Sequence, residues 1–196
     1  MSDTKSKIID AAIDLFAQNG YTETNMRSLA KMVGIQPPSI YNHFKSKQEI
    51  LETILDEYQK YILEKTVTAS VLEQLEPRQA LEKMFFAFDP DIAERMTKIF
   101  KILLHEQFHE STAGEFVRKN MFQGNYDYIK SVLDRLVELH KIRKIRTGMY
   151  AKLFMAVLMT GSNEIMHFAP DEQHYMGWWP DENVITFLID QILAEI

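Results

Sequence analysis

The stretch MRSLAKMVGIQPPSIYNHFKSK, residues 26–47, decides how this chain folds. A first short helix is predicted to start after Thr24 or Asn25 and to end before Gly34, because threonine and asparagine both favour a helix start and glycine favours the left-handed residue after a helix end. A second is predicted from Pro37, since proline lacks the N–H that has no partner in a first helical turn. Two short helices joined by a tight turn are typical of proteins that place the second helix in the DNA major groove.

The second short helix, expected to end near Phe44, has two distinct faces. Ile40 and Phe44 lie four residues apart, so they share the face that packs against the rest of the protein. The opposite face carries polar side chains of the kind that reach base edges and phosphates. These side chains are Gln36, Ser39, Asn42 and His43, with Tyr41 at the flank.

Lys47 stands at the expected start of the next helix, where the helix dipole disfavours a cation. A lysine beside free helix N–H groups can form a phosphate site, whereas a solvated lysine is the plainer alternative. The neighbouring Thr24, Arg27 and Tyr41 favour the phosphate interpretation.

The charge distribution agrees with a DNA-reading N-terminus. Residues 1–47 carry six lysines and arginines and four acidic residues, a net charge of +2, whereas the whole chain has a net charge of −6. The remainder therefore carries −8, so a slightly basic segment precedes an acidic one. Ordinary scatter of charges is the alternative explanation.

Composition predicts one well-packed helical protein. Hydrophobic residues make up 46% of 196 residues, glycine and proline are scarce, and no segment alternates as a strand would. The absence of cysteine excludes disulfides and thiolate metal sites. No signal peptide and no apolar run of about 18 residues is found, so we expect a cytoplasmic location without a membrane partner.

Helices are predicted along the whole chain, and only residues 69–76 are ambiguous between loop and helix. The expected ranges are 5–19, 26–33, 37–44, 47–66, 77–88, 89–109, 112–141, 147–168 and 181–196. The fold class is therefore all-α, with about nine helices.

The N-terminal pattern resembles the DNA-binding region of the TetR/AcrR family of bacterial transcriptional regulators. The matching residues are Ile9, Ala12, Leu15, Phe16, Gly20, Tyr21, Thr24, Leu29, Ala30, Gly34, Ile35, Ser39, Ile40, Tyr41, His43, Phe44, Ser46, Lys47 and Leu51. Gln36-Pro37-Pro38 and Asn25 depart from the usual pattern. The resemblance implies phosphate contacts from Thr24, Tyr41 and Lys47. The full set of expected DNA-binding residues is Thr24, Asn25, Arg27, Gln36, Pro37, Ser39, Tyr41, Asn42, His43 and Lys47.

The same resemblance implies a DNA-binding domain at residues 1–47 and an effector-binding and dimerisation domain at residues 48–196. Methionine and aromatic side chains suit an apolar pocket, although they equally fill a helical core. The candidate pocket residues are Tyr61, Phe85, Phe86, Met96, Phe100, Leu103, Phe122, Tyr126, Phe154, Met155 and Met159. We expect a small, apolar or aromatic effector and no cofactor. Glu106 and Glu164 could face a cation, but a surface position is favoured.

The last two long helices are expected to pair two copies of the chain into a homodimer, because their apolar stripes are too large to leave in water. Burial within one chain is the alternative for each position. The candidate interface residues are Leu153, Val157, Gly161, Glu164, Val184, Phe187, Leu188 and Gln191.

Two further motifs suggest other activities. Residues 105–109, HEQFH, match the H-E-x-x-H zinc-peptidase signature, but no third ligand is evident and the N-terminal pattern accounts for the chain differently. The basic run at residues 141–146 could bind nucleic acid, although cations ending a helix explain it more simply. We therefore predict a ligand-responsive regulator, by default a repressor, that binds a palindromic DNA operator as a homodimer. The alternatives are a helical ligand-binding protein that does not read DNA and a zinc hydrolase.

Overall fold

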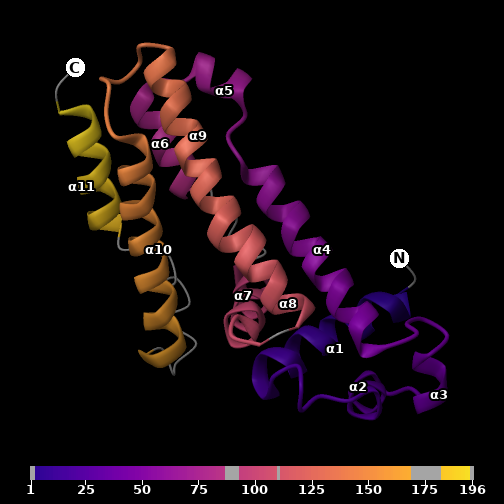
Figure 1. The fold of residues 1–196 in the computed structure, drawn as a ribbon. Coiled ribbons are helices and arrows are strands. Elements are labelled where there is room, and N and C mark those ends of the chain that lie inside the picture. The colour runs from indigo at the N-terminus through magenta and orange to yellow at the C-terminus, as the bar shows by residue number, and fades with distance from the viewer. Residues whose placement is uncertain (1–2, 87–92, 110, 169–181, 195–196) are drawn as a thin grey trace. The chain divides into compact units, whose positions relative to one another are not determined.

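The computed structural model describes residues 3–86, 93–109, 111–168 and 182–194, with the backbone alone for residues 86, 93 and 161–168. Every regular element in these ranges is a helix (Figure 1). The elements are α1 (Asp3–Asn19), α2 (Met26–Val33), α3 (Pro37–Ile40), α4 (Lys47–Lys65), α5 (Ala69–Gln74), α6 (Pro77–Phe86), α7 (Ala93–Glu106), α8 (Thr112–Phe116), the π-helix η2 (Val117–Gly124), α9 (Asn125–Glu138), α10 (Thr147–Phe168) and α11 (Glu182–Leu193). The predicted all-α class is confirmed. None of the helices in the described ranges is long and apolar enough to cross a bilayer.

The helices form two compact units. The first comprises Met1–Leu63 and Pro90–Arg118, and the second comprises Glu64–Asp89 and Lys119–Ile196. The predicted DNA-binding segment thus shares its unit with most of α4 and with α7 and α8. Whether the functional boundary lies at residue 47 stays a prediction.

The core of the first unit is built by helices with one apolar face each. In α1, Ile9, Ile13 and Phe16 recur at helical spacing and are all buried. Gly20 ends this helix with φ +83°, and the Tyr21 ring packs edge-on against Phe16, with centroids 5.2 Å apart. The predicted end of this helix is therefore confirmed.

The second unit packs α5, α6, α9, α10 and α11 around a separate core. The neighbouring pairs are α9 with α10, α10 with α11, and α6 with α11 (Figure 1). Phe85 and Phe154 stack in this core with ring centroids 4.5 Å apart. In the ambiguous segment at residues 69–76, residues 69–74 form the short helix α5, and Leu75 and Glu76 lie beyond its end.

Several predicted helices differ in length from the observed ones. α3 has four residues and continues as a turn, with Phe44 N–H donating to Ile40 O at 3.0 Å, instead of running as a helix to Phe44. The helix expected at 112–141 is a continuous helical run that ends at Glu138 and contains the π-helix η2. The N-cap of this run is Ser111, whose hydroxyl accepts from Gly114 N–H at 3.1 Å. The expected start at 89–91 lies outside the described residues.

Candidate DNA-binding site

The local geometry of α2 follows from its caps. Asn25 Oδ1 accepts from the N–H groups of Arg27 and Ser28 at 3.1 and 3.0 Å, and the Ser28 hydroxyl accepts from Asn25 N–H at 3.2 Å. At the other end Gly34 adopts φ +78°, and Ile35 N–H reaches back to Ala30 O at 3.0 Å. These two caps fix where the chain enters and leaves the helix before α3.

The turn into α3 exposes the polar face that the sequence predicts. Gln36 is extended and precedes Pro37 at the first helical position. Ile40 and Phe44 are buried on the inner side. Among the expected DNA-binding residues, the exposed ones are Asn25, Arg27, Gln36, Pro37, Tyr41 and Asn42, and the half-buried ones are Ser39 and His43. A surface of hydrogen-bonding groups therefore lies on one side of the α2–α3 segment.

Two expected phosphate-binding residues occupy a different environment. Thr24 is buried, and its hydroxyl donates to Gly20 O at 2.9 Å, with Leu15 O at 3.3 Å. The Lys47 ammonium donates to three backbone carbonyls of residues 21–24. Both side chains are committed to the protein's own backbone, which sequence patterns did not reveal.

A buried polar cluster beside this turn was not predicted. Glu106 is only 4% exposed and accepts from the Ser111 hydroxyl at 3.2 Å, so the expected surface position of Glu106 is wrong. Burial raises the pKa of Tyr21, with a further contribution from Glu106. The sequence did contain a signal for the burial of Glu106. Together with Ile99, Ile102 and Leu103 it forms one helical face with the spacing i, i+3, i+4 and i+7, and all four residues are buried.

Tyr21 also connects to the start of α4. Its hydroxyl donates to Gln48 Oε1 at 3.3 Å, and Gln48 Nε2 donates to the hydroxyl of Thr112. The residues after α1 are thus linked by side chains to α4 and, through Gln48, to α8.

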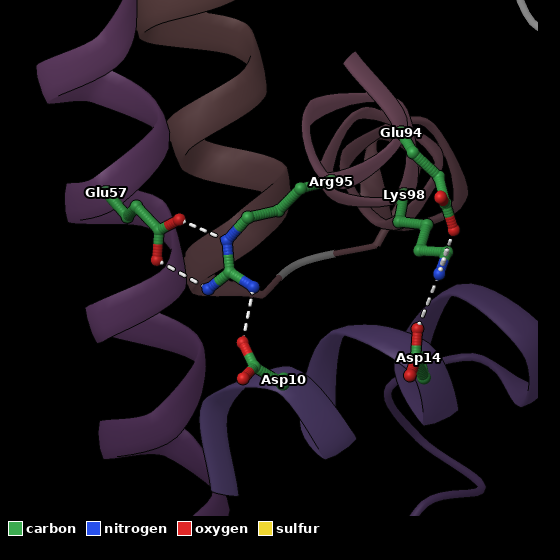
Figure 2. Close-up of polar contacts among 6 residues, drawn as sticks. All are labelled: Asp10, Asp14, Glu57, Glu94, Arg95 and Lys98. Carbon is green, nitrogen blue, oxygen red and sulfur yellow. Dashed lines mark hydrogen bonds and ion pairs between the residues drawn. The ribbon is translucent and has the colours of Figure 1, made fainter. Parts of the chain in front are cut away.

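Ion pairs join α7 to α1 and α4 (Figure 2). The Arg95 guanidinium binds Glu57 through Nε and Nη2, at 2.5 and 2.9 Å, and binds Asp10 through Nη1 at 2.5 Å. Lys98 donates to Asp14 at 2.8 Å. Two acidic side chains of α1, Asp10 and Asp14, are therefore paired with cations of α7.

The zinc-peptidase pattern does not have the geometry that it requires. α7 ends at Glu106, so His109 lies beyond the helix and does not share a helical face with His105. Glu106 is engaged with Ser111. Within the described ranges no group of three or more potential metal ligands is found.

The candidate pocket residues are distributed over both compact units. In the first unit Met96, Phe100 and Leu103 are buried on α7, and Tyr61 is half-buried. In the second, Phe85 and Phe154 are buried, whereas the half-buried ones are Phe122, Tyr126, Met155 and Met159. The Phe86 side chain lies outside the described residues. Whether any of them line a pocket stays a prediction.

The candidate dimer residues show a partly exposed apolar face in the second unit. Leu153 on α10 is 42% exposed, and Val184 and Phe187 on α11 are 39% and 58% exposed. Leu188 is instead buried, consistent with a role inside one chain, while Val157 is half-buried and Gln191 exposed. The side chains of Gly161 and Glu164 lie outside the described residues.

The basic run at 141–146 has structural partners. Lys141 Nζ donates to the backbone carbonyls of Glu73 and Leu75, at 2.9 and 2.6 Å, and Arg143 donates to Gln191 O at 3.2 Å. Lys141 and Arg143 therefore bind carbonyl groups at and just beyond the end of α5 and in the last turn of α11. In these contacts they do not bind the carbonyls at the end of α9, the helix that precedes them.

The comparisons with known proteins agree with this geometry. Residues 8–54 match the profile described as "Bacterial regulatory proteins, tetR family". The chain is 25% identical over 172 residues to the HTH-type transcriptional regulator AcrR of Shigella flexneri, which covers 86% of this chain and 80% of AcrR. It is 34% identical over 113 residues to the biofilm operon icaADBC HTH-type negative transcriptional regulator IcaR of Staphylococcus aureus, covering 57% of this chain and 60% of IcaR.

The fold is also shared with solved structures. One is AibR in complex with isovaleryl coenzyme A and operator DNA, with a TM-score of 0.66, 17% identity, and coverage of 99% of this chain and 100% of that one. The curated relatives are transcriptional regulators and not enzymes. Residues 8–54 therefore belong to the TetR family of bacterial regulatory proteins, and the chain is similar along most of its length to the transcriptional regulator AcrR.

Proposed function

We propose that this regulator binds a palindromic DNA operator as a homodimer, represses transcription, and is released by a small effector. The observation that carries the proposal is the set of exposed polar side chains on the α2–α3 segment. The segment is held in place by the two caps of α2 and by the buried side chains of Ile40 and Phe44. We expect the protein to act in the cytoplasm, where the chromosome lies.

In this proposal base recognition depends on exposed side chains of the turn and of α3. Asn42 and Gln36 carry amides, which pair with adenine edges, and the Arg27 guanidinium suits phosphate or guanine. Tyr41 is 54% exposed, which leaves its hydroxyl accessible to a phosphate. Thr24 and Lys47 are expected to contribute through the backbone that they hold.

Two copies would pair through the exposed apolar side chains of α10 and α11. Leu153, Val184 and Phe187 supply the apolar surface that a two-fold helical interface requires. One DNA-binding segment, residues 1–47, carries a net charge of only +2, so its attraction to DNA is weak. Two such segments in a dimer bind one operator together, which increases the affinity by avidity. Two half-sites about 34–36 Å apart are expected, one helical turn of DNA.

The effector is expected to be apolar or aromatic, because the candidate pocket side chains are methionine and aromatic. AibR, which shares the fold, was solved with both isovaleryl coenzyme A and operator DNA. The effector must bind the DNA-free state more tightly than the DNA-bound state, or it shifts no equilibrium. The residues of α4 are divided between the two compact units. We therefore expect effector binding to act on the DNA-binding segment through a displacement of α4.

The test is selection of duplexes from a random-sequence library by the full chain. An enriched palindrome supports the proposal, and Asn42→Ala should then lose discrimination at one base pair of each half-site, by about 1–3 kcal/mol. If no sequence is enriched, the chain is a helical ligand-binding protein that does not read DNA.

A further inference from the structure

Lys47 occupies an unusual position for a lysine, the first residue of α4. Its ammonium donates to the carbonyl oxygens of Tyr21, Thr24 and Thr22 at 2.5, 2.7 and 3.2 Å. It also lies 4.2 Å from the centre of the Tyr21 ring. The cation of this half-buried side chain therefore contacts three carbonyls and one aromatic ring of the chain itself.

These contacts use the full donor capacity of the side chain. An ammonium group has three N–H donors, and the three carbonyls accept all of them. Partial burial lowers the pKa of Lys47, opposed by the carboxylates of Glu106 and Glu23. A phosphate could bind this ammonium only by displacing a carbonyl, so the contact would gain little.

The carbonyls belong to the connection that sets the position of α2. Gly20 ends α1, and Asn25 caps α2, so residues 21–24 are the whole link between the two helices. The buried Thr24 hydroxyl ties the same link to Gly20 O and Leu15 O. Lys47 and Thr24 thus both hold this link in place.

We propose that Lys47 is a positioning residue of the DNA-binding site, which fixes the 21–24 link and with it α2 and α3, and does not bind a phosphate. The inference rests on the proposed DNA-binding function and deepens it. It reverses the expectation from the sequence, where Lys47 stood as a phosphate ligand.

The experiment separates the two roles by their salt dependence. Lys47→Met removes the ammonium and keeps an apolar stem. We expect its affinity for the duplex selected by the unmodified chain to fall about tenfold, as for loss of a charge-assisted contact. The slope of log affinity against log salt should stay unchanged, whereas each lost phosphate contact would reduce it by about 0.9. Arg27→Met, at an exposed cation of α2, is the matched variant expected to reduce the slope.

A second readout does not depend on DNA. Amide hydrogen exchange at residues 21–25 should accelerate in Lys47→Met without DNA, and exchange in α9 should not change. Because the chain has no cysteine, Lys47→Cys introduces a single thiol, and its aminoethylation restores an ammonium of similar reach. That modification should restore both slow exchange and affinity, even where Lys47→Met folds poorly.

A reduced salt slope with unchanged exchange would overturn the proposal in favour of a phosphate contact. Unchanged affinity and unchanged exchange would also overturn it. If the unmodified chain selects no duplex, the proposed function fails, while exchange at residues 21–25 still tests whether Lys47 holds the link.

Discussion

Replacing Arg95 with methionine tests how α7 is fixed to the rest of its unit. The guanidinium makes a two-point contact with Glu57 on α4 and a further ion pair with Asp10 on α1 (Figure 2). The side chains of Arg95, Glu57 and Asp10 are 31%, 34% and 52% exposed, so solvent screens both pairs. Each such pair contributes about 0.2–1 kcal/mol, with the two-point pair at the upper end.

We therefore expect Arg95→Met to lower the free energy of unfolding by about 1–2 kcal/mol, or Tm by about 2–8 °C for a chain of this size. The measurement is thermal unfolding followed by circular dichroism. Glu94→Gln is the matched control, because Glu94 is 72% exposed and pairs with Lys98, one turn away on the same helix. That pair is worth about 0.3–0.5 kcal/mol.

Two further measurements test whether the ion pairs of Arg95 cause this loss of stability: the effect of salt on Tm and a double-mutant cycle. At about 1 M salt, where the screening length is about 3 Å, the difference between Arg95→Met and its control should shrink. Combining Arg95→Met with Asp10→Asn should cost less than the two changes separately. Equal Tm values for Arg95→Met and Glu94→Gln, or a difference independent of salt, would refute the assignment of these ion pairs as the contacts that hold α7.

Three other changes have expected outcomes. Gly114→Ala should destabilise the protein by about 2–3 kcal/mol, because a Cβ would overlap the carbonyl oxygen of His109. Gly124→Ala should be neutral or stabilising by up to about 1 kcal/mol, because the atom nearest to its Cβ, the Lys119 carbonyl oxygen, would lie 3.4 Å away. Urea unfolding of the two variants compares their free energies of unfolding. Phe187→Glu should convert the expected dimer to monomer in analytical ultracentrifugation without loss of helicity, and an unchanged sedimentation coefficient would remove the α10–α11 interface. Hydrogen bonds from Lys130 and Thr147 lower the pKa of Asp134, so its contribution to stability is present above the ordinary carboxyl pKa and is lost as pH falls through the lower folded value. Asp134→Asn should therefore weaken the acid dependence of Tm below about pH 4, and an identical acid profile would contradict the assignment.

The helices that the sequence predicted best are those with strong local signals. α2 ends before Gly34 as expected, and its N-cap is Asn25, one of the two starts that the sequence left open. Both ends depend on the conformation of single residues. The all-α class followed from apolar spacing, and the resemblance to the TetR/AcrR family followed from the pattern of residues 8–51. The end of α7 was placed wrongly, because nothing at residues 107–109 is a strong terminator in sequence.

Some features of the candidate DNA-binding site were likewise predictable from the sequence and others were not. The exposed polar side chains around α3 were predictable, because the buried Ile40 and Phe44 settle which side of residues 36–44 faces the protein. The roles of Thr24 and Lys47 were not predictable. The carbonyls that Lys47 binds lie 23 to 26 residues away along the chain, so this contact depends on how α1, α2 and α4 pack.

The sequence by itself determined the helical class, the short helices around Gly34 and the family, because these depend on local propensity and on spacing along one chain. Only the tertiary structure decided that the Lys47 ammonium faces carbonyls and that Asp10 faces Arg95. A charged side chain has the same local signature whether water, phosphate or protein satisfies it. The choice depends on which groups the fold brings within hydrogen-bond distance.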